Sequence, residues 1–269
     1  MRTCLIVTTY NWPEALHLTL ASVARQKLPP DEIVVADDGS GPATRAVVDG
    51  WRAAGLPLEH VWQEDQGFRL ARSRNRAIAA TGAEYILLVD GDMILHPHFV
   101  ADHARCARPD CFIQGARPQL SAATTTRLLR GDGTANVGPL TPGLRRRTYA
   151  LRSQLLSRVF SSTKDTLGGV QGCNQSFWRS HAIRVNGYDE RFTAWGPEDR
   201  EFVARLLHLG VRRRYVRHMA IAFHLHHVSR APRTPNPFDR LLHETLAQRA
   251  TWTEQGLAAH LDAAGRRQA

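Results

Sequence analysis

The 269-residue sequence has little lysine, little cysteine and no long apolar run, and each shortage limits its interpretation. The four cysteines are scattered and lack the paired short spacings of a zinc knuckle, so we expect them to be reduced and mostly buried. No uninterrupted apolar stretch approaches the roughly 20 residues that span a bilayer, and no apolar leader precedes a small-residue cleavage site. We therefore expect a cytoplasmic protein, and the 43% hydrophobic fraction indicates a globular core.

Positive charge comes almost entirely from arginine, since Lys27 and Lys164 are the only lysines. The 35 basic and 25 acidic residues give a formal net charge of +10. A basic surface attracts phosphates of any kind, so nucleic acid, anionic lipid headgroups and nucleotide diphosphates all stay open. A compositional bias toward arginine, without any special partner, explains the charge equally well. The net charge therefore selects no ligand class.

Short apolar runs alternate with amphipathic stretches along much of the chain. The runs predict strands that stop at polar or acidic residues, and the stretches predict helices. This alternation indicates right-handed crossovers and an α/β fold with a mostly parallel sheet flanked by helices, whose ligands bind outside the carboxyl ends of the strands. The predicted strands are 4–9, 33–36, 58–62, 85–89 and 221–226, and the predicted helices are 13–23, 43–54, 70–80 and 197–209.

The pattern divides the chain into four parts. Residues 1–117 form a first half that ends beyond an Asp-Gly-Asp motif. Residues 118–167 are rich in Thr, Gly, Pro and Arg without clear periodicity, so we expect a mobile loop with short helices. Periodicity returns in 168–236, which we interpret as the second half of the same domain, and 237–269 form a helical tail with a basic, Ala-rich end that frays.

Two predicted strands run directly into aspartates. In one, Asp90 and Asp92 flank Gly91, and two such carboxylates can hold a hard divalent cation together with a diphosphate. In the other, Asp37 and Asp38 stand where a carboxylate can accept hydrogen bonds from ribose hydroxyls. Turn formation and helix capping explain each motif equally well when it is considered alone. Two acidic strand ends in one sheet favour a nucleotide site.

Two further acids, Glu198 and Asp199, stand in the first turn of a predicted helix, just after Trp195. The helix dipole favours ionised acids at this position. An anion that faces a cleft can accept a proton from an attacking hydroxyl, and an indole ring offers a flat face to a sugar ring. The alternative is a charged helix start behind a Gly-Pro turn, without a chemical role.

Three histidines, His224, His226 and His227, stand on or just after the last predicted strand. Residues two apart on a strand point to the same side, so His224 and His226 can reach one ion, whereas we expect His227 to face away. Zinc would need further ligands, and no cysteine pair is near. Together with Asp92, the two histidines make a mixed oxygen and nitrogen site that suits manganese.

These motifs, in this order, resemble the family 2 glycosyltransferases of the GT-A fold. The later part resembles the family 7 galactosyltransferase module and the acceptor-side motif of bacterial chondroitin polymerases. The joint occurrence is far more specific than any single motif. The resemblance covers about residues 3–228 and rests on segments 5–13, 37–40, 65–75, 90–92, 172–178 and 186–202.

The resemblance implies an inverting enzyme that moves a hexose or N-acetylhexosamine from a UDP-sugar to a hydroxyl of a saccharide or lipid-linked saccharide. Asp199 would be the general base, with Glu198 holding the acceptor hydroxyl or substituting as the base. Asp92 would be the main carboxylate on Mn²⁺ or Mg²⁺, with His224 and His226 as further ligands, although the His-Leu-His-His sequence leaves the choice of histidines open.

The resemblance also assigns substrate contacts and parts of the chain. Residues 1–117 become the donor-binding half, 168–236 the acceptor and catalytic half, and 118–167 a lid that excludes water over bound donor. The implied donor contacts are Thr8, Tyr10, Asn11, Asp37, Asp38, Gln66, Gly67, Arg69, Arg74, Asp90 and Gly91, and the implied acceptor or sugar contacts are Trp195, Gly196 and Asn174.

The basic charge and the habit of this family also predict peripheral contact with the anionic inner face of a bacterial membrane, in surface polysaccharide or lipopolysaccharide synthesis. Two other classes remain open. A nucleotidyltransferase shares the architecture, but the basic Gly-rich phosphate loop is missing after the first strand. A nucleic-acid-binding protein would explain the charge, yet no recognition helix or zinc finger accompanies it, so we expect no specific nucleic-acid partner.

Overall fold

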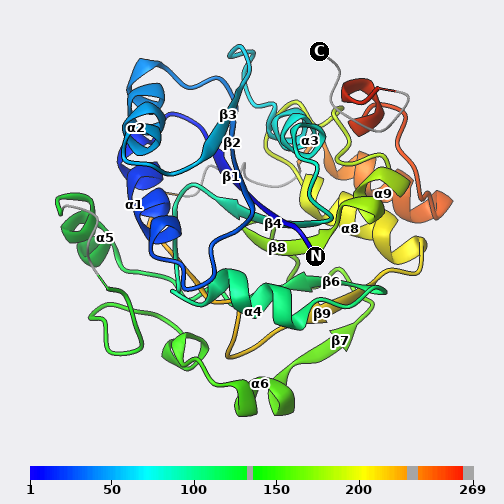
Figure 1. Cartoon of the computed structure of the whole chain (residues 1–269). Helices are drawn as coiled ribbons and strands as arrows, with labels where there is room; N and C mark the ends of the chain where they lie inside the picture. The colour runs from blue at the N-terminus through cyan, green and yellow to red at the C-terminus, as the bar shows by residue number, and fades with distance from the viewer. Residues whose placement is uncertain (132–135, 229–235, 263–269) are drawn as a thin grey trace.

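A computed structural model describes residues 1–131, 136–228 and 236–262 of the chain. Its main sheet has the strand order β3-β2-β1-β4-β8-β6-β9-β7 (Figure 1). A small second sheet pairs β10 with β5. The strands are β1 (Thr3–Thr9), β2 (Glu32–Asp37), β3 (Leu58–Trp62), β4 (Tyr85–Asp90), β5 (Met93–Leu95), β6 (Cys111–Gln114), β7 (Ser162–Lys164), β8 (Asn174–Trp178), β9 (Arg212–Tyr215) and β10 (Ala222–His224).

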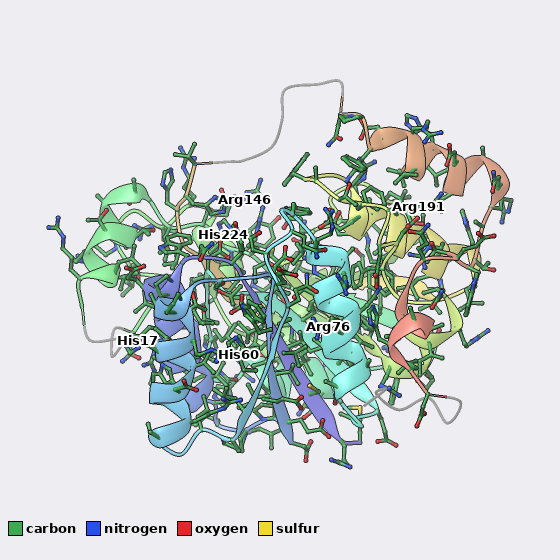
Figure 2. The ribbon with its side chains drawn as sticks, turned by 90° about the horizontal axis from the view of Figure 1, so that it is seen from above. His17, His60, Arg76, Arg146, Arg191 and His224 are labelled. Atoms are coloured by element: carbon green, nitrogen blue, oxygen red, sulfur yellow. The ribbon has the colours of Figure 1, made fainter. Side chains whose placement is uncertain are left out.

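The four strands β3, β2, β1 and β4 are parallel, whereas β8 is antiparallel to both of its neighbours. Helices cover both faces of the sheet, and in Figure 2 the flank with α1, α2 and His17 lies opposite the flank with α8, α9 and Arg191. The helices are α1 (Pro13–Ala24), α2 (Pro42–Ala53), α3 (Leu70–Ala80), α4 (Phe99–Cys106), α5 (Ala122–Leu129), α6 (Gln154–Phe160), α7 (Arg179–Arg184), α8 (Glu198–His208) and α9 (Asp239–Gln248), with 3₁₀ turns η1 (Arg147–Ala150) and η2 (Leu257–His260).

The core lies on both sides of the sheet because β1, β2 and β4 are apolar along their middle residues, which are buried. Alternate residues of β1 point to opposite faces, so Ile6 packs in the cluster that contains α3 and α8. Leu5 and Val7 pack in the other cluster, with α1, α2 and α4. Strands buried on both faces read as continuous hydrophobic runs, which is the pattern of residues 4–7 and 85–89.

The sequence interpretation of the fold is confirmed, with shifts at the element ends. The predicted α/β class and mostly parallel sheet are present, and all four cysteines are free and buried. The last predicted strand is shorter than residues 221–226, since β10 stops at His224 and the Leu225 amide donates to the Asp92 carbonyl instead. Residues 118–167 contain α5, η1 and α6 as short helices, together with the edge strand β7, and 132–135 of this segment lie outside the described residues.

The tail after residue 237 is helical as expected, in α9 and η2, and its basic end at 263–269 lies outside the described residues. In the part of the chain that the structure describes, no helix combines the length and apolar character needed to cross a bilayer.

Strand register brings the acidic strand ends together. In the parallel pairing, Thr8 of β1 stands opposite Asp90 of β4, and Thr9 stands opposite Asp37 of β2. All three strands therefore end at one level. The polar residues that follow them meet at a single edge of the sheet, where α/β proteins bind ligands.

Candidate active site

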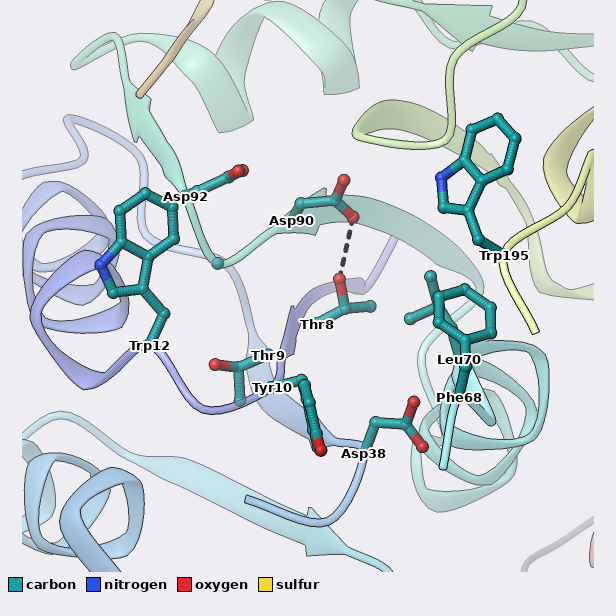
Figure 3. A pocket seen from close by; sticks show the side chains of 11 residues that line it. Thr8, Thr9, Tyr10, Trp12, Asp38, Phe68, Leu70, Asp90, Asp92 and Trp195 are labelled. Carbon is teal, nitrogen blue, oxygen red and sulfur yellow. Dashed lines mark hydrogen bonds between the residues drawn. The ribbon is translucent and has the colours of Figure 1, made fainter. Parts of the chain in front are cut away.

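A cleft opens beyond this edge of the sheet. It has two overlapping lobes of about 470 and 980 Å³, and these volumes are in the range of pockets that bind small molecules and cofactors. Figure 3 shows the lobe nearer β1, where the side chains of Asp90 and Asp92 stand across an open space from Tyr10 and Asp38. The larger lobe continues to Glu198, Asp199, His224 and His227. The three acidic motifs and the histidine cluster therefore share one cavity.

The turn after β4 is held by β1. Asp90 accepts a hydrogen bond of 2.9 Å from the Thr8 hydroxyl (Figure 3). The Gly91 amide donates to the Thr8 carbonyl at 2.6 Å. A Cβ at Gly91 would lie 2.7 Å from that carbonyl oxygen, which is closer than side-chain carbons approach. Glycine between the two aspartates lets the chain pass β1 closely, so that both carboxylates face the cleft.

Asp92 forms the centre of a cluster of three metal-ligating side chains. Its Oδ2 lies 3.3 Å from Nε2 of His224 and 3.3 Å from Nε2 of His227. Burial acts to raise the pKa of Asp92, but the two histidine hydrogen bonds outweigh it and hold this pKa well below its ordinary value. The other carboxylate oxygen, Oδ1, is buried and finds no hydrogen-bond partner in the part of the chain that the structure describes. One ligand atom from each side chain lies within 4.8 Å of the others, which is compact enough to hold one cation.

The structure brings His227, not His226, to Asp92. The prediction extended strand alternation to residue 226, but β10 ends at His224, so the period of two does not continue. Beyond that point the chain turns, and the His226 amide donates to the Thr125 hydroxyl while its side chain is exposed. The expected orientation of His227 away from the site is therefore wrong, and the expected contact of His224 with Asp92 is present.

A buried arginine joins the two acidic motifs. Arg74 of α3 is 2% exposed, and its guanidinium lies 3.1 Å from Glu198 and 3.5 Å from Asp90. It also stacks over the Tyr188 ring at 5.0 Å. Burial opposes its charge, but Tyr188 and the carboxylates of Glu198 and Asp90 outweigh this and raise the pKa of Arg74. The charge of Arg74 therefore stabilises acids on both sides of the cleft.

Helix α8 begins at Glu198 and presents both of its first two acids to the cleft. Burial raises the pKa of Glu198 to about 7, against the opposing effect of Arg74. Burial also raises the pKa of Asp199, although its carboxylate accepts hydrogen bonds from the amides of Gly172 at 2.8 Å and Arg200 at 2.7 Å. A carboxylate with a raised pKa accepts a proton near neutral pH more readily than an exposed one.

The two aspartates after β2 have different surroundings. Asp38 lines the cleft and accepts hydrogen bonds from the Gln63 amide group at 2.6 Å and the Arg69 backbone at 2.9 Å. Asp37 is fully buried and binds the Ser40 amide and His60, so it closes the turn. The structure therefore does not bring Asp37 to the cleft surface, and Asp38 is the acid of this pair that faces a ligand.

Several predicted donor contacts also line the cleft, namely Thr8, Tyr10, Asn11, Arg74, Asp90 and Gly91. Asn11 has a positive φ of 48°, and its side chain accepts a hydrogen bond from the Gly41 amide, which fixes the loop after β1. Among the described residues that line either lobe, Gln66, Gly67 and Arg69 are missing. The Arg69 guanidinium instead donates to the Thr193 carbonyl and ties this loop to the segment before Trp195.

Of the predicted sugar contacts, Trp195 and Gly196 line the cleft and Asn174 does not. Trp195 is 44% exposed, and Figure 3 shows its indole at the mouth of the pocket, beside Leu70 and Phe68. Asn174 is fully buried, and its side chain bonds the carbonyls of Ala116 and Ala220 and the His103 ring. It therefore holds β8 to its neighbouring segments, and it has no surface left for a sugar.

Comparisons with known proteins agree with this geometry. The model of the family described as "Glycosyl transferase family 2" matches residues 4–151, more than half of the chain. This chain belongs to glycosyl transferase family 2. A second model, described as "N-terminal domain of galactosyltransferase", matches residues 158–228 of this glycosyltransferase.

Two curated relatives are similar to this glycosyltransferase over most of its length. Chondroitin synthase of Escherichia coli is 27% identical over 235 residues, which are 82% of this chain and 34% of that protein. Validoxylamine A glucosyltransferase of Streptomyces hygroscopicus subsp. limoneus is 30% identical over 225 residues, which are 75% of this chain and 47% of that protein. The chain thus spans about a third to a half of the length of these relatives.

Solved structures share the fold. TarS of S. aureus in complex with UDP-GlcNAc superposes with a TM-score of 0.65 at 19% identity, covering 96% of this chain and 69% of TarS. The mannosyltransferase PcManGT of Pyrobaculum calidifontis, in complex with GDP-Man and Mn²⁺, superposes with a TM-score of 0.57 at 19% identity, covering 91% and 69% of the two chains. The sheet and helices of this glycosyltransferase are those of the GT-A fold.

Sequence reasoning missed several residues that line the cleft of this glycosyltransferase. Trp12 and Phe68 contribute apolar surface, and Arg117 and Gln119 come from the segment after β6. Phe68 stands within a motif that the resemblance had already selected, so it could have been found. Arg117 stands at the boundary of a segment without periodicity, and no pattern in the sequence distinguishes it from the other arginines.

Burial of Asp38 predicts a pH dependence of stability. It raises the pKa of Asp38 from an ordinary 3.8 to about 6, so the folded state binds this proton more tightly than the unfolded state does. Protonation of Asp38 therefore stabilises the folded state. This stabilisation is complete below the ordinary pKa and is lost as the pH rises through the pKa of the folded state. Asp38→Asn should therefore reduce the fall in unfolding free energy between pH 4 and pH 7 by about 2–3 kcal/mol. Urea unfolding across this range measures it; exposed Asp49→Asn should leave the profile unchanged.

Proposed function

We propose that this glycosyltransferase is an inverting hexosyltransferase, which moves a hexose or N-acetylhexosamine from a UDP-sugar to a hydroxyl of a saccharide acceptor. One observation carries the proposal: Asp92, His224 and Asp199 line the same cleft although they come from three distant parts of the chain. Inversion requires one displacement at the anomeric carbon, with a base on the acceptor side and charge neutralisation at the leaving diphosphate. Asp199 at one end of the cleft would act as the base, and Asp92 and His224 at the other end would hold the cation that neutralises the diphosphate.

Asp199 is the proposed general base. Two backbone amides donate hydrogen bonds to its carboxylate, so its orientation does not depend on contacts with other, more flexible side chains. As the acceptor oxygen attacks the anomeric carbon, Asp199 takes the hydroxyl proton and the bond from the sugar to the diphosphate breaks. Glu198, paired with Arg74, holds the acceptor hydroxyl or takes over as the base. Trp195 provides a flat apolar surface for a sugar ring.

The residues present fit a divalent cation. Asp92, His224 and His227 would hold it, and the buried, unpartnered Oδ1 of Asp92 is a free ligand atom. Mixed carboxylate and imidazole ligands suit Mn²⁺, and Mg²⁺ is the alternative. When bound, the cation would neutralise negative charge on the departing diphosphate. Arg74 and the Thr8 hydroxyl keep the neighbouring Asp90 oriented toward the cleft.

Exchanging single histidines tests the ligand set. His227→Gln should weaken Mn²⁺ binding in the presence of UDP by about 10- to 100-fold, because an amide is a poorer ligand than an imidazole. His226→Gln is the matched control, since His226 is one residue away and turns away from Asp92. Calorimetric titration of Mn²⁺ into each variant measures the affinity. Equal losses in both variants, or a larger loss at His226, would contradict the assignment.

The relatives support the proposed donor and acceptor. TarS binds UDP and UDP-GlcNAc in its solved complexes, and one curated relative is a chondroitin synthase. We assign a UDP-sugar as donor and a saccharide or lipid-linked saccharide as acceptor, in bacterial surface polysaccharide or lipopolysaccharide synthesis. Residues 1–117 form the donor half, 168–236 the acceptor half and 237–269 a helical tail. The described parts of 118–167 belong to a segment that orders over bound donor and excludes water.

A donor screen tests the function directly. Each of the UDP-sugars of glucose, galactose and their N-acetylamines is incubated with the protein, Mn²⁺ and a panel of oligosaccharide acceptors, and released UDP is measured. We expect acceptor-dependent release with one donor and a product whose anomeric configuration is opposite to that of the donor by NMR. Retained configuration would contradict the inverting mechanism, and metal-independent release would contradict the role of the cation.

Peripheral membrane contact forms part of the proposal. Helix α6 exposes three apolar side chains, Leu155 at 70%, Val159 at 66% and Phe160 at 49%, next to exposed Arg158. Apolar side chains flanked by arginine fit the surface of an anionic bilayer. Flotation with phosphatidylglycerol vesicles should recover the parent protein and lose Val159→Gln, whereas Leu28→Gln, at an exposed leucine distant in sequence, should float normally. Absence of binding at low salt would count against this contact.

A further inference from the structure

A second cavity of about 300 Å³ lies beside the cleft and has no role in the mechanism above. We call it the basic pocket. Its cations are Arg117, Arg146, Lys164 and Arg213, and two tyrosines, Tyr149 and Tyr215, complete the polar wall. Its lining among the described residues contains no Asp or Glu, although acids make up 25 residues of the chain.

Arg213 is the strongest indication that this pocket binds an anion. The residue is 4% exposed, and its guanidinium donates to the Gly168 carbonyl at 2.9 Å. Its Nε is buried and has no hydrogen-bond partner among the described residues. Burial lowers the pKa of Arg213, which marks its charge as poorly solvated. A buried guanidinium is normally paired with a carboxylate, because an unpaired charge in a protein interior is costly.

None of the four cations is neutralised within the described part of the chain. No carboxylate of residues 1–131, 136–228 or 236–262 lies within 4.0 Å of a charged nitrogen of Arg117, Arg146, Lys164 or Arg213. The neighbouring Arg212 differs, since it lies on the exposed side of β9 and pairs with Asp165. The charge of the pocket is therefore concentrated and unbalanced, as in sites that bind phosphate or carboxylate groups.

The basic pocket adjoins the catalytic end of the cleft. Arg117 and Gln171 line both cavities. Gln171 is followed by Gly172, whose amide binds the Asp199 carboxylate. Gln114 fixes this wall, because its side chain bonds both the amide and the carbonyl of Gln171. A group in the basic pocket therefore lies on the Asp199 side of the cleft, whereas Asp38 lines only the other lobe.

We propose that the basic pocket binds an oxyanion carried by the acceptor, a phosphate or a carboxylate near the saccharide that receives the sugar. This inference rests on the proposed function, because only that assignment makes the Asp199 side the acceptor side. Arg213 holds the anion from the floor of the pocket, Arg146 and exposed Lys164 hold it from the rim, and Arg117 connects it to the cleft. The enzyme thereby selects acidic acceptors over neutral ones of the same size.

Binding of small anions tests the proposal without a known acceptor. Protein saturated with UDP and Mg²⁺, which fills the donor lobe, is titrated with inorganic phosphate, sodium glucuronate or neutral glucose, and the rise in Tm with concentration gives each affinity. We expect at least one anion to bind and glucose not to bind. Arg213→Met and Lys164→Gln should each weaken that anion about tenfold or more, because each removes a charged hydrogen-bond donor.

Arg212→Gln is the matched control, since it removes the same charge from the same strand outside the pocket, and it should leave anion binding unchanged. Phosphate binding identifies the anion as a phosphate of the acceptor, and glucuronate binding identifies it as a carboxylate. The proposal is overturned if neither anion binds. It is also overturned if Arg212→Gln weakens binding as much as Lys164→Gln does. Lys164 is exposed, so its exchange should leave the fold intact. Failure of UDP itself to bind with Mg²⁺ would instead refute the proposed function.

Discussion

Asp199→Asn should lower the rate of sugar transfer by about 10²- to 10⁴-fold, the range that a positioned general base contributes. The amide keeps the shape of the side chain and its acceptor oxygen for the Gly172 amide, so the start of α8 should stay in place. It cannot accept the proton of the attacking hydroxyl. UDP and Mn²⁺ should bind within about twofold of the parent, because the variant leaves Asp92, His224 and His227 intact.

Transfer is measured by UDP release with an active acceptor, and binding by calorimetry with and without Mn²⁺. Asp49→Asn, an exposed exchange of the same type on α2, is the control and should retain full activity. Glu198→Gln separates the two acids of α8: a larger loss there than at Asp199 would assign the base to Glu198. Turnover of Asp199→Asn close to that of the parent would remove Asp199 from the mechanism.

The sequence was sufficient to predict the fold because strands that are buried on both faces of a sheet consist mostly of consecutive apolar residues. Residues 4–9 are an apolar run that ends in two threonines, residues 85–89 are apolar throughout, and each matches a strand to within one or two residues. Errors arose where tertiary pairing decides the outcome. Whether residues 225 and 226 continue a strand depends on a partner, and β5 ends its pairing with β10 at His224. The edge strand β7 is polar and exposed, so no hydrophobic pattern predicted it.

The candidate site was predictable as a set of motifs, and less so residue by residue. Aspartates at strand ends were sound candidates because parallel register brings such ends together. The sequence does not tell which of two adjacent acids faces the cleft, because that depends on the local backbone conformation. Asp37 is buried, whereas Asp38 lines the pocket. Asn174 has the polarity of a ligand contact, but three buried partners already use its amide.

The sequence also gave no sign that Arg74 joins the acidic motifs of Asp90 and Glu198, because these partners are 16 and 124 residues away. Arg74→Gln should lower the free energy of unfolding by about 3–5 kcal/mol, since it leaves buried carboxylates without their counter-charge. The loss should be larger at pH 8 than at pH 6. Without Arg74 the pKa of Glu198 in the folded protein rises further above its ordinary value. A protein with such a group becomes less stable as the pH rises toward that folded pKa.

Chemical denaturation without ligands measures this loss, with Arg72→Gln on the same helix as control, where a change within about 0.5 kcal/mol is expected for a half-exposed side chain. The double variant Arg74→Gln/Glu198→Gln should lose less than the sum of the single variants, by about 0.5–3 kcal/mol, because the carboxylate that Arg74 neutralises is then absent. Strict additivity would show that Arg74 acts through packing on Tyr188 rather than through its charge. In that case Arg74 would not hold down the pKa of Glu198 against burial, and the electrostatic link between the two acidic motifs would have to be abandoned.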